Sequence, residues 1–174
     1  MTATGGICAI EPVAAASDPV PSGPGFPNIN PLTGLSTDYL NHFTEAIMVL
    51  EMAASLPECL DDLRAWRPKT YTEHFASSRF ANREAVIRAY EAADPAVRAA
   101  LEEASETLNA VLVETRSVVL EHLATPAAAA LAQRGLHWLK PLIAGTAAVI
   151  NGTKTKHPER TGSPQAAIDA IFAR

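Results

Sequence analysis

The stretch "DPAVRAALEEASETLNAVLVETRSVVLEHL", residues 94–123, decides the fold class. Asp94 followed by Pro95 is typical of a helix start, because aspartate accepts a backbone hydrogen bond and proline needs no donor in the first turn. Apolar residues then recur at spacings of three and four, which predicts one helix over 95–123, roughly 43 Å long at 1.5 Å per residue. The stripe consists of Val97, Leu101, Ala104, Leu108, Val111, Leu112, Thr115, Val118, Val119 and His122.

A second long helix is predicted to follow, from residue 126 to about residue 150. Thr125 followed by Pro126 repeats the pattern of a side-chain acceptor and a proline at a helix start. Pro141 lies inside this helix and predicts a kink there. Asn151–Gly152 suits its end, because these residues adopt the left-handed conformation that closes many helices.

Shorter helical signals precede these two long helices. Ser36 or Thr37 suits the cap of a helix over about 36–54, in which apolar residues again recur every three or four positions. The sequence "TYTE" at 70–73 fits a capping box. The period of two that indicates a strand is not found. The sequence predicts an all-α fold, an up-and-down bundle of three long helices with shorter segmented helices.

Composition divides the chain into three parts. Residues 1–35 contain six prolines and several glycines, so we expect an extended or disordered arm. Residues 36–152 form the predicted helical bundle. Residues 153–174 read as a polar linker followed by a short C-terminal helix. Apolar residues late in the arm, such as Ile29, Leu32 and Leu35, suit docking against the bundle.

Charge and hydropathy narrow the classes of function. The formal net charge is −5, with only 14 lysines and arginines and no basic stripe, so we expect no nucleic acid partner. The most apolar segment is shorter than the roughly 20 clean residues that a membrane-spanning helix needs, so no membrane span is expected. Cys8 and Cys59 are far apart and lie in no metal-binding or redox motif, which favours a reducing cytoplasm.

Histidines beside carboxylates are the main candidates for chemistry. Asp38, His42 and Glu45 share one side of the first predicted helix, and His122 lies on the inward stripe of the longest one. Bundles build metal sites from such side chains in their interior, so these four residues are candidate metal ligands. The alternative is an ion-paired helix edge and a buried His122 whose partner is a carboxylate or hydroxyl of the first helix or the 70–78 helix.

Apolar residues outside the predicted core stripes suggest a contact surface. Met48 and Met52 point away from the stripe of the first helix, and Val113 and Leu120 lie seven apart on the back of the longest helix. Flexible methionines suit adaptable contacts with a protein partner or a second copy. The alternative is that the arm or the C-terminal helix covers them.

These patterns lead to two hypotheses of function. The common enzyme motifs are absent from the sequence, which favours a protein without chemistry of its own and with no cofactor. The first hypothesis is therefore a cytoplasmic binding or accessory protein, acting through helix faces as a homodimer or with a protein partner. The second is a bundle with a buried histidine and carboxylate site that binds a metal or another cofactor.

Overall fold

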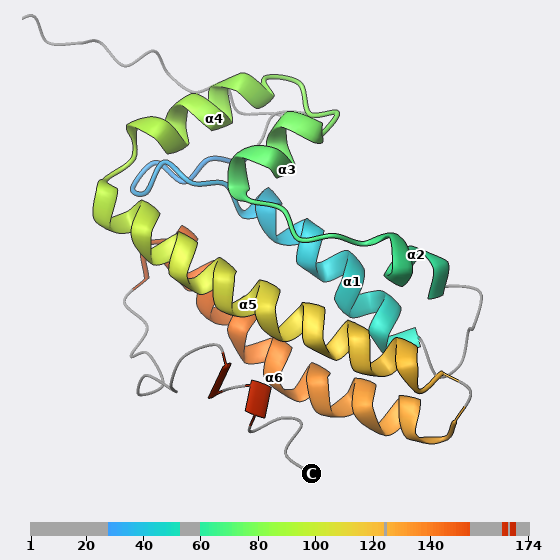
Figure 1. The fold of residues 1–174 in the computed structure, drawn as a ribbon. Coiled ribbons are helices and arrows are strands. Elements are labelled where there is room, and N and C mark those ends of the chain that lie inside the picture. Colours follow the sequence, from blue (N-terminus) through green and yellow to red (C-terminus); the bar gives the residue numbers. More distant parts are fainter. Residues whose placement is uncertain (1–27, 53–59, 124, 154–164, 167, 170–174) are drawn as a thin grey trace, which may run out of the picture.

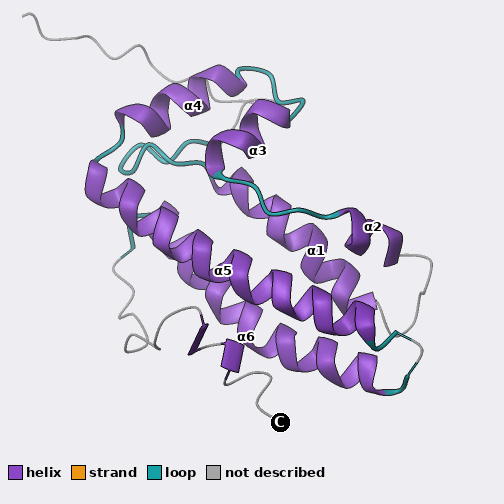
Figure 2. Cartoon of the chain, in the orientation of Figure 1, coloured by secondary structure: helices purple, strands orange, loops and turns teal. Residues whose placement is uncertain are grey.

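A computed structural model describes residues 28–52, 60–123, 125–153, 165–166 and 168–169 of the chain. Its elements are the 3-10 helix η1 (Thr37–Leu40) and the helices α1 (Asn41–Met52), α2 (Leu60–Ala65), α3 (Tyr71–Ser77), α4 (Arg83–Ala92), α5 (Pro95–Glu121) and α6 (Ala127–Ile150). Figure 2 shows helices and loops, with no strand drawn among the described residues. The prediction of an all-α fold is confirmed. The first part of the predicted arm and most of the predicted linker and C-terminal helix lie outside the described residues.

The longest helices, α5 and α6, lie side by side as a pair (Figure 1). Their close contact depends on Gly135, because a Cβ atom built there would lie 2.2 Å from Thr115 Cγ2. The predicted cap at the start of α6 is wrong. Thr125 Oγ1 instead donates a hydrogen bond to the carbonyl of His122 (2.8 Å), and Pro126 takes the cap position without a side-chain bond.

Two other helix starts have the predicted caps. Asp94 Oδ1 accepts a hydrogen bond from the backbone N–H of Ala96 (2.7 Å) and begins α5. Thr70 and Glu73 form both bonds of the capping box at the start of α3, since each backbone N–H donates to the other side chain. These local bonds satisfy amides that a helix start leaves without partners.

Residues 28–36, which precede η1, contact more than one helix. Thr33 Oγ1 donates a hydrogen bond to the carbonyl of Ile150 at the end of α6 (2.6 Å), and Leu35 is fully buried. The backbone N–H of Ser36 donates to the hydroxyl of Tyr71 on α3 (2.7 Å). Leu32, in contrast, is 83% exposed. Residues 28–36 therefore pack against the bundle through some of the apolar positions that the sequence suggested.

Aromatic rings join η1 and the first turn of α1 to α3. The ring centroids of Tyr39 and Phe43 lie 5.2 Å apart, and those of Tyr71 and Phe75 lie 4.8 Å apart. Tyr39 also packs on Tyr71, at 5.2 Å. The Tyr39 hydroxyl donates a hydrogen bond to the carbonyl of Lys69 (2.9 Å), just before α3. This packing places the first turns of α1 beside α3.

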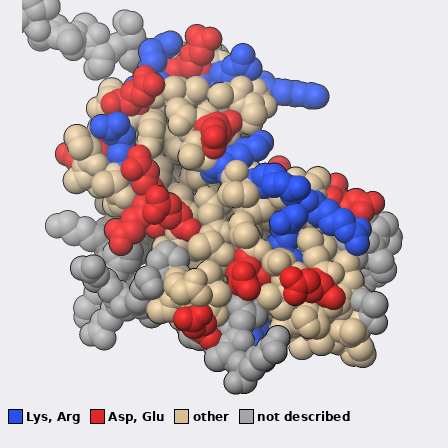
Figure 3. All heavy atoms as spheres, in the orientation of Figure 1, with Lys and Arg blue, Asp and Glu red and all other residues tan. Residues whose placement is uncertain are grey.

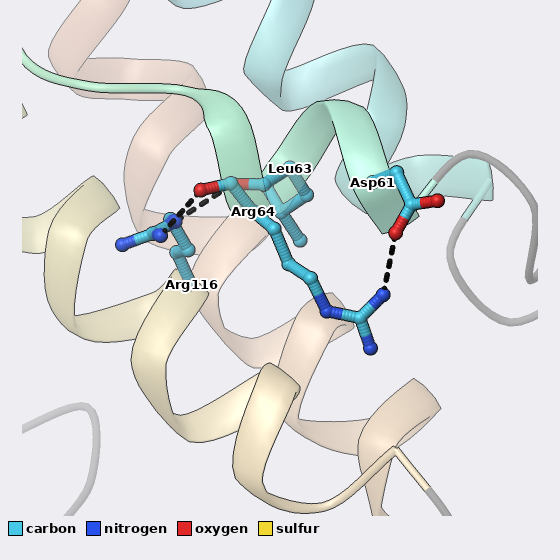
Figure 4. Close-up of polar contacts among 4 residues, drawn as sticks. All are labelled: Asp61, Leu63, Arg64 and Arg116. Carbon is cyan, nitrogen blue, oxygen red and sulfur yellow. Dashed lines mark hydrogen bonds and ion pairs between the residues drawn. The ribbon is translucent and has the colours of Figure 1, made fainter.

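An arginine of α5 holds α2 in place. Arg116 donates hydrogen bonds from Nε to the carbonyl of Leu63 (2.7 Å) and from Nη2 to the carbonyl of Arg64 (2.8 Å), as Figure 4 shows. A cation at the C-terminal end of a helix also meets the negative end of its dipole. Burial and the nearby Arg67 lower the pKa of Arg116 from its ordinary value.

Figure 3 shows basic side chains gathered over α2 and acidic side chains gathered over the first half of α5. Two of the basic side chains stabilise the fold, because Arg67 Nη1 and the Arg116 guanidinium both donate hydrogen bonds to carbonyls around the end of α2.

Among the described residues, no helix has the length and apolar character needed to cross a membrane.

Candidate functional site

The structure does not bring the four predicted metal ligands together as one group, although His42 and Glu45 line the same pocket. Asp38 Oδ2 accepts hydrogen bonds from the backbone N–H of Asn28 (3.0 Å) and from Ser36 Oγ (3.2 Å), so this carboxylate holds the segment before α1. Glu45 is exposed on α1. Within the described ranges, no three or more His, Cys, Asp or Glu side chains gather as a group that could hold a metal ion.

The predicted hydrogen-bond partner of His122, a carboxylate or hydroxyl of another helix, is wrong. Helix α5 ends at Glu121, and His122 is its C-cap residue with φ −105° and ψ 9°. The ring is half-buried, and its Nδ1 lies 2.9 Å from the carbonyl oxygen of Val118. The partner is thus the backbone of the same helix, because the chain leaves the helical path before the ring would face inward.

His42 lies beside a histidine of another helix, His74 of α3. Its ring centroid lies 5.9 Å from that of His74 on α3. The His42 ring also stacks on Trp66, with centroids 4.9 Å apart and an interplanar angle of 19°. The Trp66 indole N–H donates to the carbonyl of His42 (2.9 Å), which holds the stacked pair in register. His42 is 6% exposed, although its sequence position suggested the edge of the helix stripe.

A pocket of about 270 Å³ lies at this histidine pair. Polar side chains of α1, of α3 and of the residues on either side of α3 line the pocket, together with the ring of Phe80. One basic and one acidic residue, Lys69 and Glu45, both lie on its wall, and Lys69 Nζ donates a hydrogen bond to Ser77 Oγ (3.1 Å). The lining residues are Asn41, His42, Glu45, Lys69, His74, Ser77, Ser78 and Phe80.

Each imidazole of the pair has a nitrogen without a partner. Among the described residues, the Nε2 atoms of both His42 and His74 are buried with no hydrogen-bond partner. The backbone of Arg67 near His42 and that of Asp38 near His74 favour the charged form of each ring, but less than other effects oppose it.

Electrostatics keep both rings neutral near pH 7. Burial, the neighbouring His74 and then Lys69 lower the pKa of His42 from 6.5 to about 4. Burial and Lys69 also lower the pKa of His74. A neutral imidazole carries one proton on its two ring nitrogens, so it can donate one hydrogen bond and accept another. The pocket wall therefore holds two neutral imidazoles, and not two cations.

His74, Trp66 and Lys69 come from segments that local sequence patterns do not connect to His42. The signal for His74 was its position three residues after Tyr71 and one before Phe75, both of which are buried. A ring between two inward positions lies at the edge of the buried face of a helix.

The predicted contact residues differ in exposure. Met48 is 52% exposed and Val113 is 37% exposed. Met52 is half-buried. Leu120 is also half-buried and packs against the hydrophobic core, contrary to its expected place on the outer face of α5.

Comparisons of this chain with protein-family models, with curated proteins and with solved structures found no significant match. The function is therefore argued from the pocket and its chemistry.

Proposed function

We propose that this chain is a non-catalytic binding protein whose ligand site is the pocket around His42 and His74. One observation carries the proposal: two imidazole nitrogens from different helices are buried beside the same pocket without a hydrogen-bond partner. A ligand that engages these nitrogens supplies the interaction that the protein itself does not.

The energetic cost of this arrangement supports a role in binding. A buried polar atom without a partner costs about 1–3 kcal/mol, so the pair costs several kcal/mol in the unliganded protein. Leucine or phenylalanine at either position would avoid that cost within the surrounding aromatic cluster. Proteins keep such locally unfavourable choices mainly where function needs them.

Replacement of His74 by leucine tests this proposal. The variant removes a buried nitrogen whose missing partner costs about 1–3 kcal/mol. The nearby Asp38 carbonyl does not depend on His74, because the backbone N–H of Asn41 donates to it. We expect the free energy of unfolding, measured in urea, to stay the same or rise by about 1 kcal/mol.

His122→Leu is the matched control. This ring is also half-buried, but among the described residues neither of its nitrogens is buried without a partner. Its replacement by leucine removes the contact with the Val118 carbonyl and does not remove a buried nitrogen without a partner. The free energy of unfolding should therefore fall slightly or stay unchanged. A loss of more than about 1 kcal/mol in His74→Leu would show that the pair is structural and would overturn the proposal.

A second candidate function is association through exposed apolar side chains, with a second copy or another protein. The observation that favours it is Met48, which is 52% exposed on α1, together with the exposed Val113 on α5. Sedimentation should show a dimer at micromolar concentration that Met48→Lys dissociates. A strict monomer would exclude self-association at that concentration.

The setting that we propose is the cytoplasm, because the sequence contains only two widely separated cysteines. We propose no nucleic acid partner, since the net charge is −5 and arginines near α2 are engaged with backbone carbonyls.

A further inference from the structure

The chemical state of the two histidines narrows the class of ligand. In both His42 and His74 the Nε2 atom is buried without a hydrogen-bond partner. Imidazole nitrogen is the commonest metal-binding group of protein side chains.

Other ligand classes fit these atoms less well. An anion would face the Glu45 carboxylate on the pocket wall and would find no cationic imidazole there. An organic ammonium group would have to leave water and lie near Lys69, which the pocket also contains. A metal ion forms direct bonds to neutral imidazole nitrogens, and these bonds offset its loss of hydration.

The separation of the rings suits a shared ion. With metal–nitrogen bonds of 2.0–2.1 Å, each ring centroid lies roughly 3.2 Å from the metal, so two ligands at a tetrahedral angle have centroids about 5.2 Å apart. The centroids of His42 and His74 are 5.9 Å apart. The separation of the two rings is therefore within about 1 Å of the separation that a shared ion requires.

We propose that His42 and His74 bind one divalent transition-metal ion of the copper, nickel and zinc class through their Nε2 atoms. This inference rests on the proposed function, since it names the ligand class for the same pocket. Water or a small chelating molecule completes the coordination, because the described residues supply no group of three metal-binding side chains. Two imidazoles bind more weakly than a full set of protein ligands, and we expect affinities in the micromolar range, highest for Cu²⁺.

Trp66 provides a reporter at the site. Its ring stacks on that of His42 with centroids 4.9 Å apart, so a paramagnetic ion on His42 will quench its fluorescence. The other tryptophan, Trp138, lies beside the exposed His137, with centroids 6.4 Å apart. The experiment therefore uses full-length protein with Trp138→Phe, which removes any signal from copper on His137.

The test is a titration of this protein with CuSO₄ at pH 7, followed by tryptophan fluorescence. We expect saturable quenching at micromolar Cu²⁺ with one ion per chain, reversed by a chelator and not produced by Mg²⁺. His74→Leu and His74→Gln, each shown to be folded by circular dichroism, should weaken binding about tenfold or more, because one of two donors is lost. His122→Leu should bind copper like the parent protein.

Absence of saturable quenching, or equal quenching after both substitutions of His74, would overturn the metal inference. The free energy of unfolding of His74→Leu then shows whether the pocket is still a candidate binding site. An unchanged or higher stability leaves the pocket as a binding site for another ligand, whereas a marked loss removes the proposed function as well.

Discussion

Replacement of Gly135 by alanine is expected to disrupt the packing of α5 against α6. An added Cβ atom would lie 2.2 Å from Thr115 Cγ2, 2.6 Å from its Oγ1 and 2.9 Å from its Cβ. The first two atoms can move by rotation of the threonine side chain. Thr115 Cβ cannot, because it is fixed to the helix backbone, so the two helices must separate locally.

Two opposing effects set the size of the stability change in Gly135→Ala. Overpacking in a well-packed core costs typically about 1–3 kcal/mol, and more when the backbone has to move. Alanine in place of glycine within a helix returns about 1 kcal/mol. We expect a net loss of about 2 kcal/mol, which lowers the melting temperature by roughly 4–8 °C for a chain of this size.

The assay is urea and thermal unfolding followed by circular dichroism, with two further variants. Gly145→Ala on the same helix is the matched control, because a Cβ there meets nothing within 4 Å. It should gain about 0.5–1 kcal/mol from helix propensity alone. Adding Thr115→Ala to Gly135→Ala removes the two closest atoms and should restore part of the lost stability. If Gly135→Ala alone is as stable as the wild type, the packing argument for this helix pair is refuted.

Two other predictions concern His42 and the arginines of Figure 4. Because the pKa of His42 is lowered from 6.5 to about 4, with His74 and Lys69 as neighbours, the folded state binds fewer protons than the unfolded chain below pH 6.5. The stabilising contribution of the neutral His42 ring is complete above pH 6.5, and roughly 2 kcal/mol of it is lost on acidification to pH 4.5. Urea unfolding at several pH values should show this fall in the free energy of unfolding for the wild type and a smaller fall for His42→Leu. Arg116→Ala should lower the free energy of unfolding by about 1–2 kcal/mol, since two hydrogen bonds to α2 are lost. Arg64→Ala should change it by less than about 0.5 kcal/mol, because its ion pair with a neighbour in α2 is exposed; equal losses would contradict the role given to Arg116.

Local chemistry in the sequence determined where several helices begin and end. Asp94 and the capping box of Thr70 and Glu73 bond only to backbone groups within a few residues, so the sequence alone shows their partners. Gly152 closes the last long helix with a positive φ of 64°, as the pair Asn151–Gly152 predicts. The helical period of apolar residues is likewise local, and it was sufficient to predict an all-α fold.

The tertiary structure alone decided which side chains meet. His42 and His74 are 32 residues apart, and their contact depends on how aromatic rings pack η1 and the start of α1 against α3. His122 shows the converse, because two residues of helix fewer than predicted turned an inward position into a helix cap. Helical periodicity states which face of a helix is buried, but not which other helix covers it. The pairing of helices depends on long-range packing, so the candidate pocket became visible only in the folded chain.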